Sequence, residues 1–449
     1  MRRVLVANRG EIAVRVIRAC HDEGIEAVAV YSEADADALH VRLADAAVLV
    51  GPAPAAESYL RQEALIEAAR SAGADAVHPG YGFLSENADF ARRVEQAGLI
   101  WIGPPADVIE RMGNKAAARA LAISAGVPVV PGTEVLVDVA EARAEAARIG
   151  YPVLLKAAEG GGGKGIREIR GEEELAVAFE EVVREVTAAF GAASLYLEKS
   201  LTEVRHIEVQ LIGDRHGSIV HLFERDCSLQ RRRQKVVEEA PAYGLPDETR
   251  AALHRYAVAL GSALSYSSAG TVEFLVDADG GIYFIEVNTR IQVEHGITEM
   301  ITGVDVCAEQ LRVAAGAPLS FAQSDLAVSG HAIEARINAE NPAFHFLGSP
   351  GVIEYCRVPG GIGVRVDTFI ETGVTVQPYY DSLIAKVMVH APTRAAARRR
   401  LDRALDELEV TGIATTAGVI RRINEQEWFS EADYSTVTLE GTLPALIGA

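Results

Sequence analysis

The stretch GTVEFLVDADGGIYFIEVN, residues 270–288, predicts the β-hairpin on which the interpretation of the whole chain rests. Two runs rich in β-branched and aromatic residues lie on either side of Asp279-Gly280. An Asp-Gly pair is the preferred two-residue type I′ turn. With that pair at the tip of the hairpin, Glu273 faces Glu286 across the two strands.

This register predicts an acidic pair that favours a bound cation. Facing carboxylates with Cβ atoms about 5 Å apart repel by about 3 kcal/mol at an effective dielectric of about 20. Period-two alternation places Asn288 and Arg290 on the face of Glu286. Glu273, Glu286 and Asn288 therefore suit Mg²⁺, which takes few carboxylates and completes its shell with waters and phosphate oxygens. A solvated strand face is the alternative, and a longer turn would change the register.

A glycine run, Glu159-Gly160-Gly161-Gly162-Gly163-Lys164-Gly165, follows a predicted strand at 152–156. Glycines leave backbone N–H groups free to contact an anion and let phosphates approach closely. The run fits neither the Walker A pattern nor G-x-G-x-x-G. It indicates a phosphate-binding loop, with a flexible hairpin tip as the alternative.

Charged side chains cluster just after the hairpin. Arg290 and Glu294, four residues apart, could clamp a planar oxyanion and remove its proton, or form a structural salt bridge. The run Arg231-Arg232-Arg233-Gln234-Lys235 adds positive charge, of which one or two groups are expected to be functional. Alternation in 331–336 places Glu334 and Arg336 on one face of a strand.

The N-terminal third alternates short apolar strands with helices, which predicts a parallel α/β sheet. Ligand-contacting loops of such sheets lie beyond the carboxyl ends of the strands. The loops expected there are 8–11 and 78–82. The expected strands are 3–7, 24–31, 76–78 and 99–102, and the expected helices are 11–22, 58–72, 86–96 and 115–125.

The rest of the sequence, after the N-terminal third, predicts an α/β insert, a strand-rich part and a mixed C-terminal part. A Pro/Gly-rich boundary at 126–132 precedes the insert, which extends to about residue 205. The strand-rich part covers 206–285. The C-terminal part is mostly β from 331 to 390 and ends in two helices, at about 393–409 and 415–427.

Composition restricts the class of protein. The chain has 449 residues, which predicts about three domains, and 49% apolar with 24% charged residues is typical of a globular protein. A net charge of −20 argues against nucleic acid or an anionic membrane as a partner. No stretch approaches 18 apolar residues. The four cysteines are far apart, which favours neither a zinc site nor disulfides, and we expect a cytoplasmic protein.

Several long strings, in the correct order, resemble those of the biotin carboxylases, a family of ATP-grasp enzymes. The resemblance covers essentially the whole chain. The strings are Ala7–Ile12, His40–Asp45, His78–Asn87, Met112–Lys115, Glu224–Ser228, Lys235–Pro241, Asn288–His295, His331–Asn338 and Gln377–Ser382.

The resemblance implies an α/β and α+β fold in three domains. These are a Rossmann-like N-terminal domain (1–114), an ATP-grasp domain (115–330) with a glycine-rich lid at about 131–204, and a mixed, β-rich C-terminal domain (331–449).

The resemblance also implies roles for individual residues. The ATP-binding residues would be Lys115, Lys156, Gly162, Gly163, Glu198, Lys199, Leu201, His206, Arg233, Glu273 and Glu286. The Mg²⁺ or Mn²⁺ ligands would be Glu273, Glu286 and Asn288. The bicarbonate site would consist of Lys235, Arg290, Gln292, Val293 and Glu294. Glu294 would be the base for bicarbonate, Arg336 would stabilise the biotin enolate, and Tyr81 would lie near biotin; Arg290, Glu294, Lys235 and Arg336 form the expected catalytic group.

The implied activity is ATP- and bicarbonate-dependent carboxylation of biotin through carboxyphosphate, the first half-reaction of an acetyl-CoA or other acyl-CoA carboxylase. None of the four methionines flanks a lysine, so no Met-Lys-Met-like biotin attachment site is expected, and biotin would arrive on a separate biotin carboxyl carrier protein. A carboxyltransferase subunit and a homodimer are the other expected partners. The final carboxyl acceptor is left open.

The sequence departs from the family pattern at four positions. Arg233 stands in place of His, Glu159 in place of the first glycine of the run, and Gly296 and Gly348 each in place of Pro. These departures leave two alternatives open. One is a degenerate nucleotide-binding regulatory paralogue, and the other is a different bicarbonate-activating ATP-grasp ligase, such as a half of carbamoyl-phosphate synthetase.

Overall fold

The N-terminal region folds around a five-stranded parallel sheet. In the computed structural model, which describes residues 1–157, 165–190 and 194–447, the strand order of this sheet is β3-β2-β1-β4-β5. All its strand pairs are parallel, as predicted. Its elements are β1 (Arg3–Val6), α1 (Gly10–Asp22), β2 (Glu26–Ser32), η1 (Glu33–Asp35), α2 (Leu39–Leu43), β3 (Ala46–Gly51), η2 (Ala55–Glu57), α3 (Gln62–Ser71), β4 (Ala76–His78), α4 (Ala88–Gln96), β5 (Ile100–Trp101) and α5 (Ala106–Gly113).

Helix α1 shows why the apolar pattern predicted this region well. Its residues Ile12, Val16 and Cys20 share one face, and all three are buried in the core between the sheet and the central region. The edge strand β3 was not predicted, because half of its residues are exposed and its short apolar run has no alternation.

The central region combines a small three-stranded sheet with part of a larger one. The small sheet has the order β7-β6-β8, is antiparallel and packs against α7 and α8. The elements here are α6 (Lys115–Ser124), α7 (Val139–Ile149), β6 (Val153–Ala157), β7 (Ile166–Ile169), α8 (Glu172–Phe190), β8 (Leu195–Lys199), β9 (Arg205–Gly213), β10 (Ile219–Arg231), β11 (Gln234–Ala240), α9 (Asp247–Ala263), β12 (Ser268–Val276), β13 (Ile282–Asn288), α10 (His295–Thr302) and α11 (Val306–Ala314).

The C-terminal region extends the large sheet of the central region. The strand order of this eight-stranded sheet is β13-β12-β9-β10-β11-β14-β21-β19, and β11 pairs with β14 across the expected boundary at residue 330. The elements are η3 (Gln323–Asp325), β14 (His331–Asn338), β15 (Glu340–Asn341), η4 (Pro342–Phe344), β16 (Leu347–Gly348), β17 (Gly351–Val352), β18 (Tyr355–Arg357), β19 (Val364–Thr368), β20 (Thr375–Val376), β21 (Leu383–Ala391), α12 (Arg394–Glu407), β22 (Glu409–Thr411), α13 (Ala417–Glu425), α14 (Glu427–Glu431) and α15 (Thr438–Ile447).

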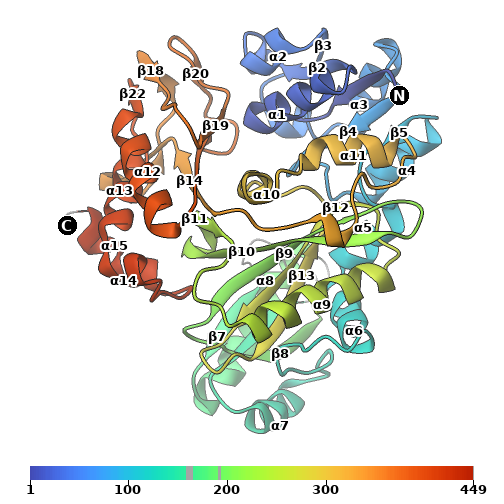
Figure 1. Ribbon diagram of the computed structural model, residues 1–449. Coiled ribbons are helices and arrows are strands. Elements are labelled where there is room, and N and C mark those ends of the chain that lie inside the picture. Colours follow the sequence, from blue (N-terminus) through green and yellow to red (C-terminus); the bar gives the residue numbers. More distant parts are fainter. Residues whose placement is uncertain (158–164, 191–193, 448–449) are drawn as a thin grey trace.

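Figure 1 shows how these regions are arranged. The parallel N-terminal sheet, the small sheet with α7, and the C-terminal helices α12–α15 lie at three corners, and β11 and β14 run near the middle. The expected α/β and α+β class is confirmed. Among the residues described, no helix is both long and apolar enough to cross a membrane.

Candidate active site

A cavity of about 560 Å³ lies where the three regions meet. The two loops predicted at the carboxyl ends of N-terminal strands both contribute to its wall, through Asn8 to Ile12 and Tyr81 to Phe83. The large sheet supplies most of the remaining polar wall. The residues from the sheet and from the segment after β13 are His206, Arg231, Lys235, Glu273, Glu286, Asn288, Arg290, Gln292, Val293, Glu294 and Arg336, and Arg233 joins them from the β10–β11 turn.

The predicted acidic pair is present, although the predicted turn is wrong. Glu273 of β12 is paired with Glu286 of β13. The tip is a longer loop that starts from Val276 opposite Ile282, which shifts the register by one residue, and a β-bulge next to Glu273 shifts it back. Ile285 is the extra residue of this bulge. The two deviations cancel, so the carboxylates face each other as expected.

The electrostatics of this pair fit a divalent cation. Burial alone would raise the pKa of Glu273, but Lys235 and His206 overcome that effect and hold the pKa well below its usual range. Burial and the facing Glu273 raise the pKa of Glu286. The pair therefore lacks sufficient positive charge on the side of Glu286, and its oxygen donors match the preference of Mg²⁺.

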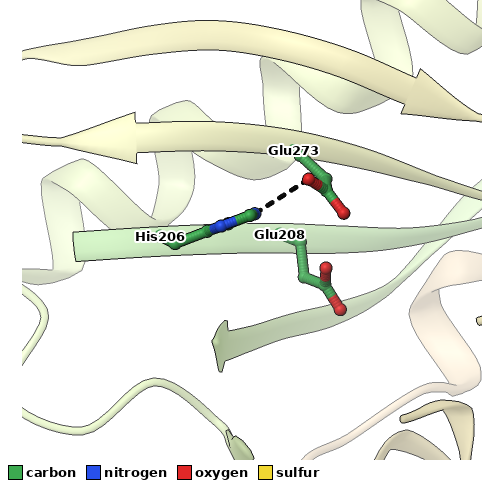
Figure 2. Close-up of side chains that lie close together, drawn as sticks. All are labelled: His206, Glu208 and Glu273. Atoms are coloured by element: carbon green, nitrogen blue, oxygen red, sulfur yellow. Dashed lines mark ion pairs between the residues drawn. The ribbon is translucent and has the colours of Figure 1, made fainter. Parts of the chain in front are cut away.

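Hydrogen bonds orient Glu273 within the cavity. Asn288 Nδ2 and Gln292 Nε2 each donate to its Oε1 over 3.0 Å. His206 Nε2 lies 2.9 Å from its Oε2, and Figure 2 shows this contact beside Glu208. Asn288 Oδ1 in turn accepts a hydrogen bond from Arg290. The expected ligands Glu273 and Asn288 thus lie together, with Glu286 across the strand pair.

Glu208 is a member of the site that the sequence interpretation missed. Its Oε2 lies 2.6 Å from Lys235 Nζ, and its Oε1 accepts from Arg225 Nε at 2.5 Å. The signal was present in the sequence, because His206 and Glu208 alternate on one face of β9 and both are buried. A buried strand with charged residues at alternate positions is unusual and marks functional groups.

Lys235 is the electrostatic centre of the cluster. Its ammonium group lies 2.6 Å from Glu208, 2.6 Å from Glu294 and 3.0 Å from Glu273. Burial opposes its charge, but the surrounding acids, with the Cys227 thiol, raise its pKa well above the usual value. Lys235 therefore remains a cation and neutralises the carboxylates that surround it.

The structure places Glu294 between Lys235 and Arg336. Its Oε1 meets Lys235, and its Oε2 lies 3.0 Å from Arg336 Nη2. Burial would raise the pKa of Glu294, but Lys235 and Arg336 hold it well below its usual range. Within the described residues Arg290 pairs with Glu86 at 3.0 Å and forms no direct bond to Glu294. The four-residue spacing thus brings Arg290 and Glu294 to one cavity without joining them.

Tyr81, from the N-terminal region, lines the same cavity as Arg336. The Tyr81 hydroxyl donates to Glu11, whose other oxygen lies 3.1 Å from Lys386. Lys386 also donates to the backbone oxygen of Val293 over 2.8 Å. These bonds connect the N-terminal loop, the segment after β13 and the C-terminal sheet.

Five expected nucleotide residues lie outside the wall of this cavity. On the small sheet, Lys156 of β6 forms an ion pair with Glu198 of β8. Lys199 donates to the backbone oxygens of Gly150 and Tyr151 over 2.8 and 3.0 Å. The other two are Leu201, which follows β8, and Lys115, the first residue of α6. Gly162 and Gly163, with Glu159, lie outside the described residues.

The family models that match the chain cover nearly all of it. The biotin carboxylase N-terminal domain matches residues 1–109 and the biotin carboxylase C-terminal domain matches 334–441. The model of the carbamoyl-phosphate synthase L chain ATP-binding domain matches 114–322.

Curated relatives and solved structures match at full length. Biotin carboxylase of Haemophilus influenzae is 51% identical over 99% of both chains, and biotin carboxylase 1 of Bacillus subtilis is 49% identical over 98% of both. Among solved structures, the biotin carboxylase domain dimer of Hydrogenobacter thermophilus 2-oxoglutarate carboxylase, in complex with MgADP, ADP and bicarbonate, has a TM-score of 0.95 and 48% identity. That match covers 100% of this chain and 99% of the other.

Proposed function

The chain belongs to the biotin carboxylase family, and from that premise we propose how its residues divide the work of ATP- and bicarbonate-dependent carboxylation of biotin. The supporting observation is one cavity that combines the acidic pair Glu273 and Glu286 with Glu294 held between Lys235 and Arg336. The first group of residues suits a metal-bound nucleotide, and the second suits a small oxyanion. The N- and C-terminal family matches favour this function over that of another bicarbonate-activating ligase.

Glu273, Glu286 and Asn288 would hold the magnesium ion. They fit the ion because two facing carboxylates leave uncompensated negative charge, which raises the pKa of Glu286 together with burial. When bound, the ion would neutralise charge on the nucleotide phosphates. The structure with MgADP bound to a relative at 48% identity supports this assignment.

The nucleotide would lie between the large sheet and the small sheet. His206 and Arg233 would contact it from the cavity wall, and Lys115, Lys156, Glu198, Lys199 and Leu201 from the other side, with the loop at Gly162 and Gly163. Positive groups around the transferred phosphoryl group stabilise the charge that builds up on its oxygens during attack. Exclusion of water from this space would protect carboxyphosphate from hydrolysis.

Bicarbonate would bind against Lys235, Arg290, Gln292 and the backbone of Val293, with Glu294 as the base. The lowered pKa of Glu294 keeps it ionised and ready to accept a proton. The same cations make Glu294 a weak base while they contact it. A bound oxyanion would share Lys235 with Glu294, which would raise the basicity of the carboxylate at the moment of proton transfer.

Biotin would lie at the end of the cavity formed by Tyr81 and Arg336. Carboxyphosphate would release CO₂ there, and the phosphate so formed would take the proton from biotin N1. The Arg336 guanidinium would stabilise the negative charge on the ureido oxygen of the enolate, which then attacks CO₂. Glu238 and Glu294 hold this guanidinium in place.

The test of this assignment is Glu294→Gln, which removes the base but preserves size. We expect transfer of labelled bicarbonate to free biotin to fall by about 10²- to 10⁴-fold, while calorimetry still detects ATP binding. Hydrolysis of ATP by the unmodified enzyme should require bicarbonate and increase with free biotin. ATP hydrolysis at the same rate without bicarbonate would contradict the proposal.

We also propose the partners of the enzyme. Biotin would be delivered by a separate biotin carboxyl carrier protein, and a carboxyltransferase subunit would complete the reaction on an acyl-CoA or another acceptor. Relatives of near-equal identity are named biotin carboxylase and 2-oxoglutarate carboxylase small subunit, which agrees with an acceptor chosen by another chain. A relative at 48% identity forms a dimer, which supports a homodimer. All four cysteines are free, which is compatible with the cytoplasm.

For the domains, we propose boundaries near residues 114 and 330, with the lid at about 131–204. The first boundary separates α5 from α6, and the lid comprises the small sheet with α7 and α8. The second falls before β14, so the last two domains share a sheet and would move little relative to each other.

A further inference from the structure

A second acidic pair, which the proposed chemistry does not use, contacts Arg336 through one of its two members. Glu334 of β14 is directly opposite Glu238 of β11 in the large sheet. Directly opposite residues of antiparallel strands have Cβ atoms about 5 Å apart. Both side chains are fully buried, with 0% and 1% of their residue surface exposed. Two ionised carboxylates repel each other strongly at this distance in a buried site, which favours a proton on one of them.

Only one of the four carboxylate oxygens of the pair accepts a hydrogen bond from the described residues. Oε1 of Glu238 accepts a bond from Arg336 Nε. In the part of the chain that the structure describes, Oε2 of Glu238 and both oxygens of Glu334 have no donor. A buried carboxylate oxygen without a donor costs free energy. A proton held between the two side chains lowers that cost, because it provides one donor and halves the charge.

The surrounding charged groups do not offer Glu334 another partner. On β21, Lys386 forms an ion pair with Glu11 and donates to the Val293 carbonyl, and its ammonium group lies 3.7 Å from Asp367. Arg336, on the strand of Glu334 itself, is committed to Glu238 and Glu294.

Among the residues that the structure describes, the other packed elements supply no hydrogen-bond donor to Glu334 either. The Tyr81 hydroxyl bonds Glu11. On α10, burial and nearby cations hold the pKa of His295 well below its usual value, so that ring is neutral. Burial and Glu238 raise the pKa of Glu334 well above its usual value, against the weaker effects of Lys386 and Arg336.

We propose that Glu334 is a positioning residue that acts as a neutral carboxylic acid. It donates a hydrogen bond to Oε2 of Glu238, which leaves the single negative charge of the pair on the oxygen that holds Arg336. The guanidinium is thereby fixed toward the biotin end of the cavity. This inference rests on the role of Arg336 in the proposed function. Its chemistry is that of two carboxyl groups sharing one proton.

The first test measures the proton on Glu334 without using activity. A buried acid that stays protonated in the folded enzyme but ionises on unfolding lowers stability as the pH rises. Glu334→Gln removes this effect. Between pH 6 and pH 8 the unfolding equilibrium constant of the unmodified enzyme should therefore rise, relative to that of E334Q, by about tenfold per pH unit.

Glu309→Gln is the matched control for this measurement. Glu309 is also buried, but Ser320 donates to both of its oxygens, and Arg312 Nε lies 3.4 Å from its Oε1. We expect the unfolding constants of E309Q and the unmodified enzyme to keep a fixed ratio over the same pH range. A fixed ratio for E334Q as well would show that Glu334 is ionised in the folded enzyme, and this would overturn the proposal.

The second test separates positioning from general structural damage. Glu334→Leu removes the donor, and we expect kcat/KM for free biotin to fall by about 10- to 100-fold. The KM for ATP should stay unchanged, since Arg336 is not among the residues assigned to the nucleotide. Glu334→Gln should restore kcat/KM for biotin to near the unmodified value, because its amide N–H can donate to Glu238.

Two outcomes would contradict the positioning role. One is E334Q as impaired as E334L, and the other is E334L with biotin and ATP parameters damaged equally. If instead the unmodified enzyme fails to carboxylate biotin, the proposed function fails. The pH-dependent unfolding of E334Q would still decide whether Glu334 carries a proton.

Discussion

Gly296 on α10 leaves the space that the side chain of Met388 on β21 occupies. A Cβ atom at residue 296 would lie 2.3 Å from the Met388 sulfur, a distance that atoms in contact do not adopt. Met388 is completely buried among Ile297, Ile301 and other apolar residues. Gly296, which stands where the family pattern has proline, therefore leaves room for Met388 two residues after Glu294.

This contact predicts a strong coupling between the two positions. Gly296→Ala should lower the free energy of unfolding by about 1–3 kcal/mol, because the added methyl overpacks a closed core. In the background of Met388→Val, which removes the sulfur, the same change should cost less. Urea denaturation of the four proteins gives the coupling energy, which we expect to exceed about 1 kcal/mol. Additive effects would show that the core adjusts elsewhere.

Glu286 should control the affinity for the metal more than the affinity for the nucleotide base. Glu286→Gln removes one oxygen charge and the repulsion with Glu273, so we expect the protein to keep its fold while the Mg²⁺ concentration at half-maximal ATP hydrolysis rises by at least about tenfold. Magnesium titrations at saturating ATP measure this shift. Glu95→Gln, at an exposed position in another cavity wall, serves as the control and should leave the titration unchanged. An unaltered titration for E286Q would remove Glu286 from the metal site.

Glu208 should be required for the position of Lys235. Glu208→Gln removes the buried carboxylate charge that forms ion pairs with both Lys235 and Arg225. Loss of a hydrogen bond to a charged group costs about 1.5–3 kcal/mol. We therefore expect kcat/KM for bicarbonate to fall by about 10- to 100-fold, with little change in the KM for ATP. Steady-state kinetics with bicarbonate as the varied substrate checks this, and a normal bicarbonate dependence would refute it.

Arg233 should lower the stability of the fold through its backbone conformation while its side chain contacts the nucleotide. Arg232 and Arg233 form the two-residue β10–β11 turn, and both have positive φ, +49° and +65°, which suits Asn or Gly far better than Arg. Arg233→Asn should therefore stabilise the protein by about 1 kcal/mol and raise the KM for ATP. Arg232→Asn, at a position that is also exposed but lies outside the cavity wall, should stabilise without changing that KM. An unchanged KM for R233N would show that the cation does not contact the nucleotide.

Local patterns predicted the elements of this site better than the contacts among them. Alternation and an assumed two-residue turn predicted Glu273 opposite Glu286, and the pairing is correct only because a bulge at Ile285 offsets the longer turn. The bulge could not be predicted, because a single extra residue changes no local propensity. The partners of Glu294 come from β11 and β14, which are neighbours in the large sheet although their residues are about 100 positions apart along the chain. Local spacing does not reveal which strands are neighbours. Spacing suggested Arg290 for that role, whereas the sheet brings Lys235 and Arg336.

Glu239 should make the free energy of unfolding decrease as the pH falls into the acid range. It is buried on β11, where His331, Arg394 and Tyr434 bond its two oxygens. Burial would raise its pKa, but His331 and Arg394 lower it to about 2, from an ordinary value of 4.5. A lowered pKa stabilises the folded state above the unfolded-state value, and this contribution is lost as the pH falls from about 5 toward 2.

The pH dependence of Glu239→Gln tests this assignment. The shift corresponds to about 3 kcal/mol at neutral pH, and the variant should lose at least that much because Arg394 keeps a buried charge with a weaker partner. Urea denaturation at pH 7 and pH 4 should show the difference between the two proteins shrinking in acid. Glu407→Gln, at a surface ion pair with Arg403, should differ from the unmodified enzyme by less than about 1 kcal/mol throughout. A difference for E239Q that stays constant with pH would mean that the ionised state of Glu239 does not support the C-terminal region.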